Sequence, residues 1–384
     1  LPDGGAARSS PRAGRPAKSH YPCRLDMAND SDATGVHGYP RPFLRRPGWL
    51  SLNGPWDFAL DPRGRHAHPR ELAWQGPILV PFAPETARSG VGERGYFQAC
   101  WYRRGILVPP DLAPDERLFL HFGAVDHLAT VWIDGAQVAS HEGGYTPFSV
   151  DLTQLARPGA ALELVVRAAD DPHELAKPRG KQDWQLHPHS IWYPRTTGIW
   201  QTVWLERVPD VHVSRVRWSS NLHRWEIGFA ATVAGDAQPD TRLRLRLLCG
   251  DRLLVDDIYD CTYREIHRRI PLGDPGIDDA RNELLWSPGA PTLLDARVEL
   301  LGRGGRVLDA FDSYTAIRTI SVQRDQILLN GRPIRLRMVL DQGYWPDTGM
   351  TAPDDEAIER DVRLAKAMGF NGVRKHQKLE DPRY

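Results

Sequence analysis

Two short polar clusters follow apolar runs near the carboxyl end of the chain. Residues 334–340 and 370–374 are typical of strands, and residues 351–369 between them are typical of a helix. This order predicts two parallel strands joined by a crossover helix. Functional side chains gather where the parallel strands of such folds end. The candidates at these two ends are Asp341, Gln342, Tyr344, Trp345, Arg374, Lys375 and His376.

The residue types in these clusters are suited to holding a ligand. The guanidinium fork of Arg374 can fix a carboxylate through two parallel hydrogen bonds. Trp345 suits either packing at the strand end or stacking on a ligand ring. His376 suits either a structural hydrogen bond or a substrate contact, so both interpretations stay open for these two residues.

The helix between the two strands has recognisable ends. Thr351 is the expected capping residue, with a proline and carboxylates in the first turn. Gly369 is the expected C-terminal stop. Apolar residues at helical spacing predict one buried face. That face consists of Ile358, Val362, Ala365 and Met368.

The rest of the chain reads as antiparallel sheet. From residue 39 onward, short runs of alternating apolar and polar residues are broken by glycine and proline turns, which predicts β-sandwiches. Residues 241–247 alternate Leu and Arg strictly, so Leu should be buried and Arg solvated. Residues 1–38 lack such periodicity and are expected to be a disordered tail, with Met27 the expected start of translation.

Composition excludes several classes of protein. The 49 basic residues balance the 49 acidic ones, which argues against a nucleic-acid partner or a polybasic membrane-surface protein. No apolar run approaches the ~18 residues of a membrane span. The four cysteines have no metal-type spacing, so we expect reduced thiols, a cytoplasmic location, and neither metal nor cofactor.

Several stretches in this order resemble glycoside hydrolase family 2, which contains β-galactosidases, β-glucuronidases and β-mannosidases. The strongest is RTTGIWQTVWLE at 195–206, and the resemblance covers roughly residues 39–384. The others are LSLNGPWDF at 50–58, FGAVDHLATVWIDG at 122–135, GGYTPF at 143–148, LWSP at 285–288 and NGRP at 330–333.

The resemblance implies a mostly β fold in three parts after the tail. Residues 39–208 would form a jelly-roll sugar-binding domain and residues 209–320 an immunoglobulin-like sandwich. Residues 321–384 would form the first βαβ unit of a truncated TIM-barrel catalytic domain. A lone βαβ unit lacks partners on its faces and edges, so we expect this last segment to be mobile or prone to aggregation.

The family hydrolyses O-glycosyl bonds with retention, using two glutamates on late barrel strands. A TIM barrel needs about 250 residues, so we expect both glutamates to be missing and the chain alone to be inactive. The resemblance assigns the two strand-end clusters to substrate binding. It adds Asp183, from a loop of the first domain, as a candidate that reaches the barrel mouth.

Both clusters depart from the family's usual residues. The stretches DQGYW and RKHQK replace the family's histidine-rich and His-Tyr-Pro patterns, which leaves the sugar open. The implied partner is a β-glycoside, and the full-length protein would be a homo-oligomer, as family members often are. The alternatives are a non-catalytic β-sandwich that binds carbohydrate and an inactive gene remnant.

Overall fold

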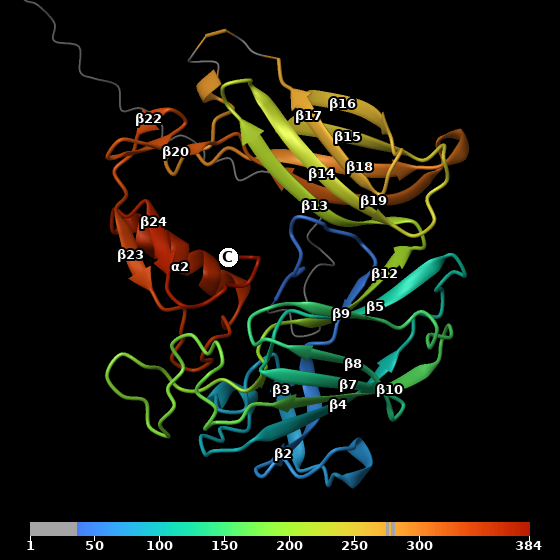
Figure 1. Cartoon of the computed structure of the whole chain (residues 1–384), viewed down its shortest axis with the longest axis vertical. Helices are drawn as coiled ribbons and strands as arrows, with labels where there is room; N and C mark the ends of the chain where they lie inside the picture. Colours follow the sequence, from blue (N-terminus) through green and yellow to red (C-terminus); the bar gives the residue numbers. More distant parts are fainter. Residues whose placement is uncertain (1–36, 274–275, 278–280) are drawn as a thin grey trace, which may run out of the picture.

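A computed structural model of the chain describes residues 37–273, 276–277 and 281–384. Figure 1 shows two β-sandwiches, with a smaller unit of strands and one helix at their side. No helix among the described residues is both long and apolar enough to cross a membrane. The mostly β fold expected from the alternating sequence is confirmed.

The first sandwich contains a six-stranded and a four-stranded antiparallel sheet. Their orders are β3-β2-β4-β10-β7-β8 and β1-β12-β5-β9, and β6 pairs with β11. Because β1 pairs with β12, the first and last strands lie in one sheet. The strands are β1 (Trp49–Ser51), β2 (Gly54–Asp61), β3 (Gly76–Val80), β4 (Ala99–Leu107), β5 (Glu116–Phe122), β6 (Val125–Asp126), β7 (Leu128–Ile133), β8 (Ala136–Glu142), β9 (Phe148–Asp151), β10 (Ala161–Ala169), β11 (Gly198–Ile199) and β12 (Val203–Pro209).

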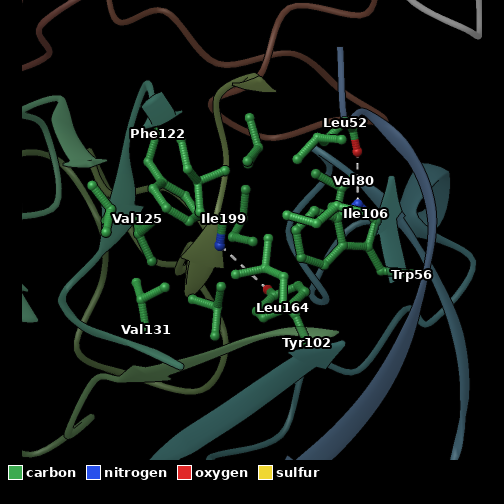
Figure 2. Packing of buried hydrophobic residues seen from close by; sticks show 14 of the residues in the cluster. Leu52, Trp56, Val80, Tyr102, Ile106, Phe122, Val125, Val131, Leu164 and Ile199 are labelled. Atoms are coloured by element: carbon green, nitrogen blue, oxygen red, sulfur yellow. Dashed lines mark hydrogen bonds between the residues drawn. The ribbon is translucent and has the colours of Figure 1, made fainter. Parts of the chain in front are cut away.

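The core of this sandwich is filled by apolar side chains of alternating strand residues. Figure 2 shows part of it, including two large aromatic residues whose polar atoms are satisfied. The Nε1 of Trp56 donates to the carbonyl of Leu52 at 2.7 Å, and the backbone N–H of Ile199 donates to the Tyr102 hydroxyl at 3.3 Å. Burial of these two rings stabilises the domain without leaving the Trp56 N–H or the Tyr102 hydroxyl unpaired.

The second sandwich packs the sheet β13-β14-β17 against the sheet β16-β15-β18-β19. The Leu residues of the alternating stretch in β15 are fully buried and its Arg residues face outward, as predicted. The strands are β13 (His212–Asn221), β14 (Glu226–Ala234), β15 (Arg242–Cys249), β16 (Arg252–Asp260), β17 (Glu265–Pro271), β18 (Leu294–Leu301) and β19 (Val307–Thr315).

The third part begins with the small sheet β20-β21-β22 and continues with a parallel pair, β23-β24, that α2 connects. The predicted strand at 334–340 is shorter than expected and begins only at Met338. The elements are β20 (Ile320–Gln323), β21 (Gln326–Leu329), β22 (Arg332–Pro333), β23 (Met338–Asp341), α2 (Asp355–Ala367) and β24 (Gly372–Lys375).

Two expectations for α2 were wrong. Its N-cap is Asp354, whose carboxylate accepts from the backbone N–H of Ala357, and Thr351 lies outside the helix. The predicted buried face is mostly exposed, because only Ile358 is fully buried while Val362 and Met368 are 44% and 73% exposed. Among the described residues, no second layer covers that side of the helix. Gly369 follows the helix end at a positive φ of 86°, as predicted.

The end of the expected N-terminal tail is also ordered. His37 is buried and its Nε2 lies 3.0 Å from the carbonyl of Ala352. The backbone N–H of Gly38 donates to a carboxylate oxygen of Asp355 at 2.9 Å. Residues 37–38 therefore pack beside the start of α2, while residues 1–36, Met27 included, lie outside the described residues.

Candidate functional site

The carboxyl ends of β23 and β24 place the predicted residues on two different faces. Leu340 pairs with Arg374, and Asp341 pairs with Lys375. Paired residues share a face of a sheet and successive residues alternate. Arg374 is exposed and lies with Leu340 on the side that α2 does not cover. Asp341 and Lys375 are half-buried on the opposite side.

An ion cluster forms on the covered side. Lys375 Nζ lies 2.6 Å from Asp341 Oδ2 and 2.9 Å from Glu380 Oε2, and it sits 3.9 Å from the centre of the Tyr384 ring. Burial alone would raise the pKa of Asp341, but the hydrogen bond and charge of Lys375 lower it overall. The carboxylate and the ammonium therefore stay charged and hold each other in place.

Lys378 joins the same cluster and was missed by the sequence analysis. Its Nζ donates to the carbonyls of Gly343 and Met350 at 2.7 Å each, and to Glu380 Oε2 at 3.0 Å. The side chain is almost fully buried. Three acceptors arranged around one atom suit an ammonium better than a planar guanidinium.

A signal for Lys378 was present in the composition. The chain has only six lysines among 49 basic residues, so two lysines three residues apart at one strand end stand out. Two of the six are Lys375 and Lys378. Two more, Lys177 and Lys181, lie in the loop of the first sandwich between β10 and β11, residues 170–197.

The remaining predicted residues contact one another, their own loop or the first sandwich. His376 Nδ1 lies 2.9 Å from Gln342 Oε1. Tyr344 stacks on Tyr193 of the first sandwich at 4.2 Å between ring centres. The backbone of Trp345 exchanges two hydrogen bonds with Gly349. These contacts order the two clusters, and they join the strand ends to the sandwich.

The loop of the first sandwich approaches the strand ends very closely. At Gly180, where φ is +61°, an added Cβ would lie 2.3 Å from the carbonyl oxygen of Gln377. Only glycine fits both this conformation and this contact. Nearby, the Thr351 hydroxyl donates to the carbonyl of Trp200 at 2.6 Å, and Trp200 Nε1 donates to the carbonyl of Gly144 at 2.7 Å. The signature stretch 195–206 thus contributes directly to the contact.

Asp183 has a different place from the one expected. Its carboxylate accepts from the backbone N–H groups of Gln185 and His189 and lies 2.7 Å from His189 Nδ1. The residue is 1% exposed. Burial would raise its pKa, but these hydrogen bonds lower it overall. Asp183 therefore organises its own loop instead of reaching the strand ends.

A second group of carboxylates is buried in the sandwich beneath this loop. Arg195 donates to Asp170 at 2.9 Å, and Gln182 donates to Asp126 at 2.6 Å. Glu85 accepts from the backbone N–H of Thr197, and its other oxygen has no hydrogen-bond partner among the described residues. Burial raises the pKa of both Glu85 and Asp126 to about 7.

The chemistry available at the strand ends is binding. A retaining glycosidase needs two carboxyl groups about 5 Å apart, one of which must carry a proton near neutral pH. Asp341 and Glu380 are close together, but Lys375 bridges them and keeps Asp341 ionised. The described residues include no group of three or more His, Cys, Asp or Glu that could hold a metal ion.

Comparisons with known proteins agree with this arrangement. Residues 95–202 match the family model described as glycosyl hydrolase 2 galactose-binding domain-like. A β-galactosidase of Thermoanaerobacter pseudethanolicus is 27% identical over 292 residues, covering 73% of this chain and 37% of that protein. A β-glucuronidase of Paenibacillus borealis is 26% identical over 339 residues, covering 84% of this chain and 54% of that protein. The chain thus spans about half or less of these relatives.

Solved structures share the fold. A β-glucuronidase from Ruminococcus gnavus in complex with D-glucuronic acid has a TM-score of 0.71 at 21% identity, with 90% of this chain and 59% of that chain covered. A Bifidobacterium dentium β-glucuronidase complexed with coumarin-3-O-glucuronide has a TM-score of 0.70 at 22% identity, with 88% and 59% covered.

Together the sandwiches and the matched domain define a β-sandwich protein that is similar to the N-terminal domains of glycoside hydrolases. More closely, the chain resembles the N-terminal portion of glycoside hydrolase family 2, and the resemblance predicted from its motifs is confirmed.

Proposed function

We propose that this chain is the N-terminal part of a cytoplasmic retaining β-glycosidase and that the ends of β23 and β24 supply one side of its sugar-binding site. The observation that supports this is the parallel pair β23-β24, which ends in polar residues beside a galactose-binding-like domain. Parallel strands with a crossover helix gather their functional groups at the end that Arg374 and His376 occupy here.

In this proposal Arg374 has the role of holding a carboxylate, of either the sugar or a catalytic glutamate. It is exposed on the uncovered face, and the described residues provide no hydrogen bond or ion pair to its guanidinium. The catalytic glutamates would come from later barrel strands outside this chain. The truncated TIM barrel, the sugar, and a homo-oligomeric full-length protein are parts of the same proposal.

The chain as given should not hydrolyse glycosides. The test uses purified 384-residue protein with nitrophenyl β-galactoside, β-glucuronide, β-mannoside and β-glucoside. We expect no release of nitrophenol above a buffer blank, because the proposal places both glutamates elsewhere. Release that persists after repeated purification would overturn this part of the proposal. The DNA after the codon for Tyr384 gives a second test, since we expect it to encode a later strand that ends in Asn-Glu.

A second candidate function is binding without catalysis. Residues 95–202, which match the galactose-binding domain-like family model, lie within the first sandwich. A stand-alone carbohydrate-binding protein would bind sugars on an array without turnover. It would also lack the downstream coding sequence that the glycosidase proposal requires.

A further inference from the structure

The outer face of the sheet β13-β14-β17 has an unusual arrangement of side chains. Figure 1 shows β14 between β13 and β17, and the register fixes which residues lie opposite one another. The middle strand contributes small residues, and the flanking strands contribute mostly basic ones, with Ser219 and Glu265 as the exceptions. The three cross-strand rows are Arg215-Thr232-Glu265, Arg217-Ala230-His267 and Ser219-Gly228-Arg269.

This arrangement forms a trough along β14. A cavity of about 310 Å³ lies over Gly228 and Ala230, between Arg217 on one side and His267 and Arg269 on the other. At Gly228 the Ser219 hydroxyl oxygen occupies the space of a side chain, because a Cβ there would lie 2.2 Å from it. A second, smaller hollow over Ala230 and the neighbouring Thr232 continues the trough along the strand.

The charges that line the trough are only partly balanced. Arg215 and Arg217 are exposed and have no hydrogen-bond or ion-pair partner among the described residues. Arg269 and His267 have carboxylates only at 3.7 and 3.6 Å, and both basic side chains are largely exposed. Such exposed and loosely formed ion pairs contribute little to stability, so they leave the basic groups accessible to a ligand.

The opposite sheet of the same sandwich provides an internal comparison. There Arg244 donates two hydrogen bonds of 2.7 Å to Asp256, and Arg246 donates to Glu299 at 3.3 Å. Those two arginines are neutralised by neighbours, whereas Arg242 and Arg252 of the same sheet have no hydrogen-bond or ion-pair partner among the described residues. What distinguishes the trough is that Arg215 and Arg217 lie two residues apart beside a hollow over small residues.

We propose that this trough binds an acidic polysaccharide chain at a site separate from the strand ends of β23 and β24. Guanidinium groups pair bidentately with carboxylates. Positions two residues apart on a strand lie about 7 Å from each other, so Arg215 and Arg217 offer charges in a row to a polymer with repeating carboxylates. The low floor at Ala230 leaves room for the C–H face of a sugar ring.

The choice of a glycan over an acidic protein segment rests on the proposed function as a glycosidase. Binding at the trough does not depend on hydrolysis, so the two proposals can fail separately. If the chain binds acidic oligosaccharides but belongs to no enzyme, the trough proposal stands and the glycosidase proposal fails. If the full-length protein is an active glycosidase but does not bind acidic oligosaccharides, the glycosidase proposal stands and the trough proposal fails.

The test measures binding of hexagalacturonate to the 384-residue chain by isothermal titration calorimetry at low salt. The matched ligand is the fully methyl-esterified hexamer, which keeps the sugars and lacks the charges. We expect binding of the acid form only, with affinity that falls as salt rises. The double substitution Arg215→Ser with Arg217→Ser should weaken it about tenfold.

Two further variants separate the site from general charge effects. Arg303→Ser with Arg306→Ser removes the same charge from exposed residues on a distant hairpin and should leave the affinity unchanged. Ala230→Leu fills the trough without changing charge and should weaken binding. Equal binding of the ester, equal loss in both double variants, or equally tight binding of polyglutamate through Arg215 and Arg217 would each overturn the proposal.

Discussion

At the scale of single residues, Lys378 has the clearest structural role, because it joins the chain after β24 to the connection between β23 and α2. Its ammonium satisfies two backbone carbonyls and Glu380 in a nearly dry setting. An ammonium so buried is retained only because every acceptor around it is paired. Burial lowers its pKa overall, although the charge of Glu380 opposes this.

Replacing Lys378 by methionine should therefore be strongly destabilising. Lys378→Met leaves the carbonyls of Gly343 and Met350 without this donor and leaves Glu380 with Lys375 as its ammonium partner, which should cost about 3 kcal/mol of unfolding free energy. Urea unfolding followed by tryptophan fluorescence measures the change. Lys366→Met, on the exposed last turn of α2, is the matched control and should change little. Equal effects of the two substitutions would contradict the role given to Lys378.

Glu85 should make stability depend on pH. Its pKa is raised to about 7 in the folded protein, against about 4.3 in an unfolded chain. Folding therefore takes up a proton, so the contribution is full below about pH 4 and is lost as pH rises through 7. Glu85→Gln should reduce the fall in unfolding free energy between about pH 5 and pH 8.

Urea unfolding of both proteins at the two pH values measures this prediction. Some fall should persist in the variant, because Asp126 has a similar raised pKa. The control is Glu142→Gln, at a side chain that is 76% exposed, and it should keep the dependence of the natural protein. An unchanged pH dependence in Glu85→Gln would show that Glu85 stays ionised when buried.

At the scale of elements, the sequence predicted the order of strand, helix and strand correctly but not the partners of each side chain. The stop at Gly369 is local and was predicted. The exposure of Val362 and Met368 depends on which elements cover α2, and helical spacing alone contains no such information. The cluster around Lys378 was missed because its two carbonyl acceptors belong to the connection between β23 and α2, about 30 residues away in sequence.

Substitutions can show whether Asp354 or Thr351 caps the N-terminus of α2. Asp354→Ala removes the acceptor for the N–H of Ala357 and should cost about 1 kcal/mol, with faster amide exchange in the first helical turn. Thr351→Val should instead disturb the contact with Trp200 and leave that first turn protected. Hydrogen exchange read by mass spectrometry distinguishes them. Faster exchange of the first turn in Thr351→Val alone would restore Thr351 as the cap.

At the scale of the whole molecule, the exposed connection between the second sandwich and the parallel pair is the most accessible part of the third region. Residues 321–326 are all exposed, and Arg324, Arg335 and Arg337 are exposed tryptic sites in this connection. The segment after them is bound to the first sandwich through Tyr344 and other contacts. The mobility expected for 321–384 stays a prediction, and the structure concentrates it in this connection.

Limited trypsin digestion should cut this connection before either sandwich, because its arginines are exposed and its strands are short. Apart from cuts in the expected N-terminal tail, mass spectrometry of early products should place the first cuts between residues 321 and 337. The fragment that follows should still elute with the sandwiches in gel filtration, held by the contacts of Thr351 and Tyr344. In Lys378→Met it should separate more readily. Early cuts within β13–β19 would contradict this order.

The uneven use of lysine has one practical consequence. Four of the five described lysines are held by contacts, Lys177 and Lys181 within the first sandwich and Lys375 and Lys378 at the strand ends, while Lys366 is exposed on α2. An amine-acylating reagent therefore reports on the strand ends in the natural protein without any engineered label. Slow modification of Lys375 and Lys378 relative to Lys366 would measure the fraction of molecules that keep these contacts.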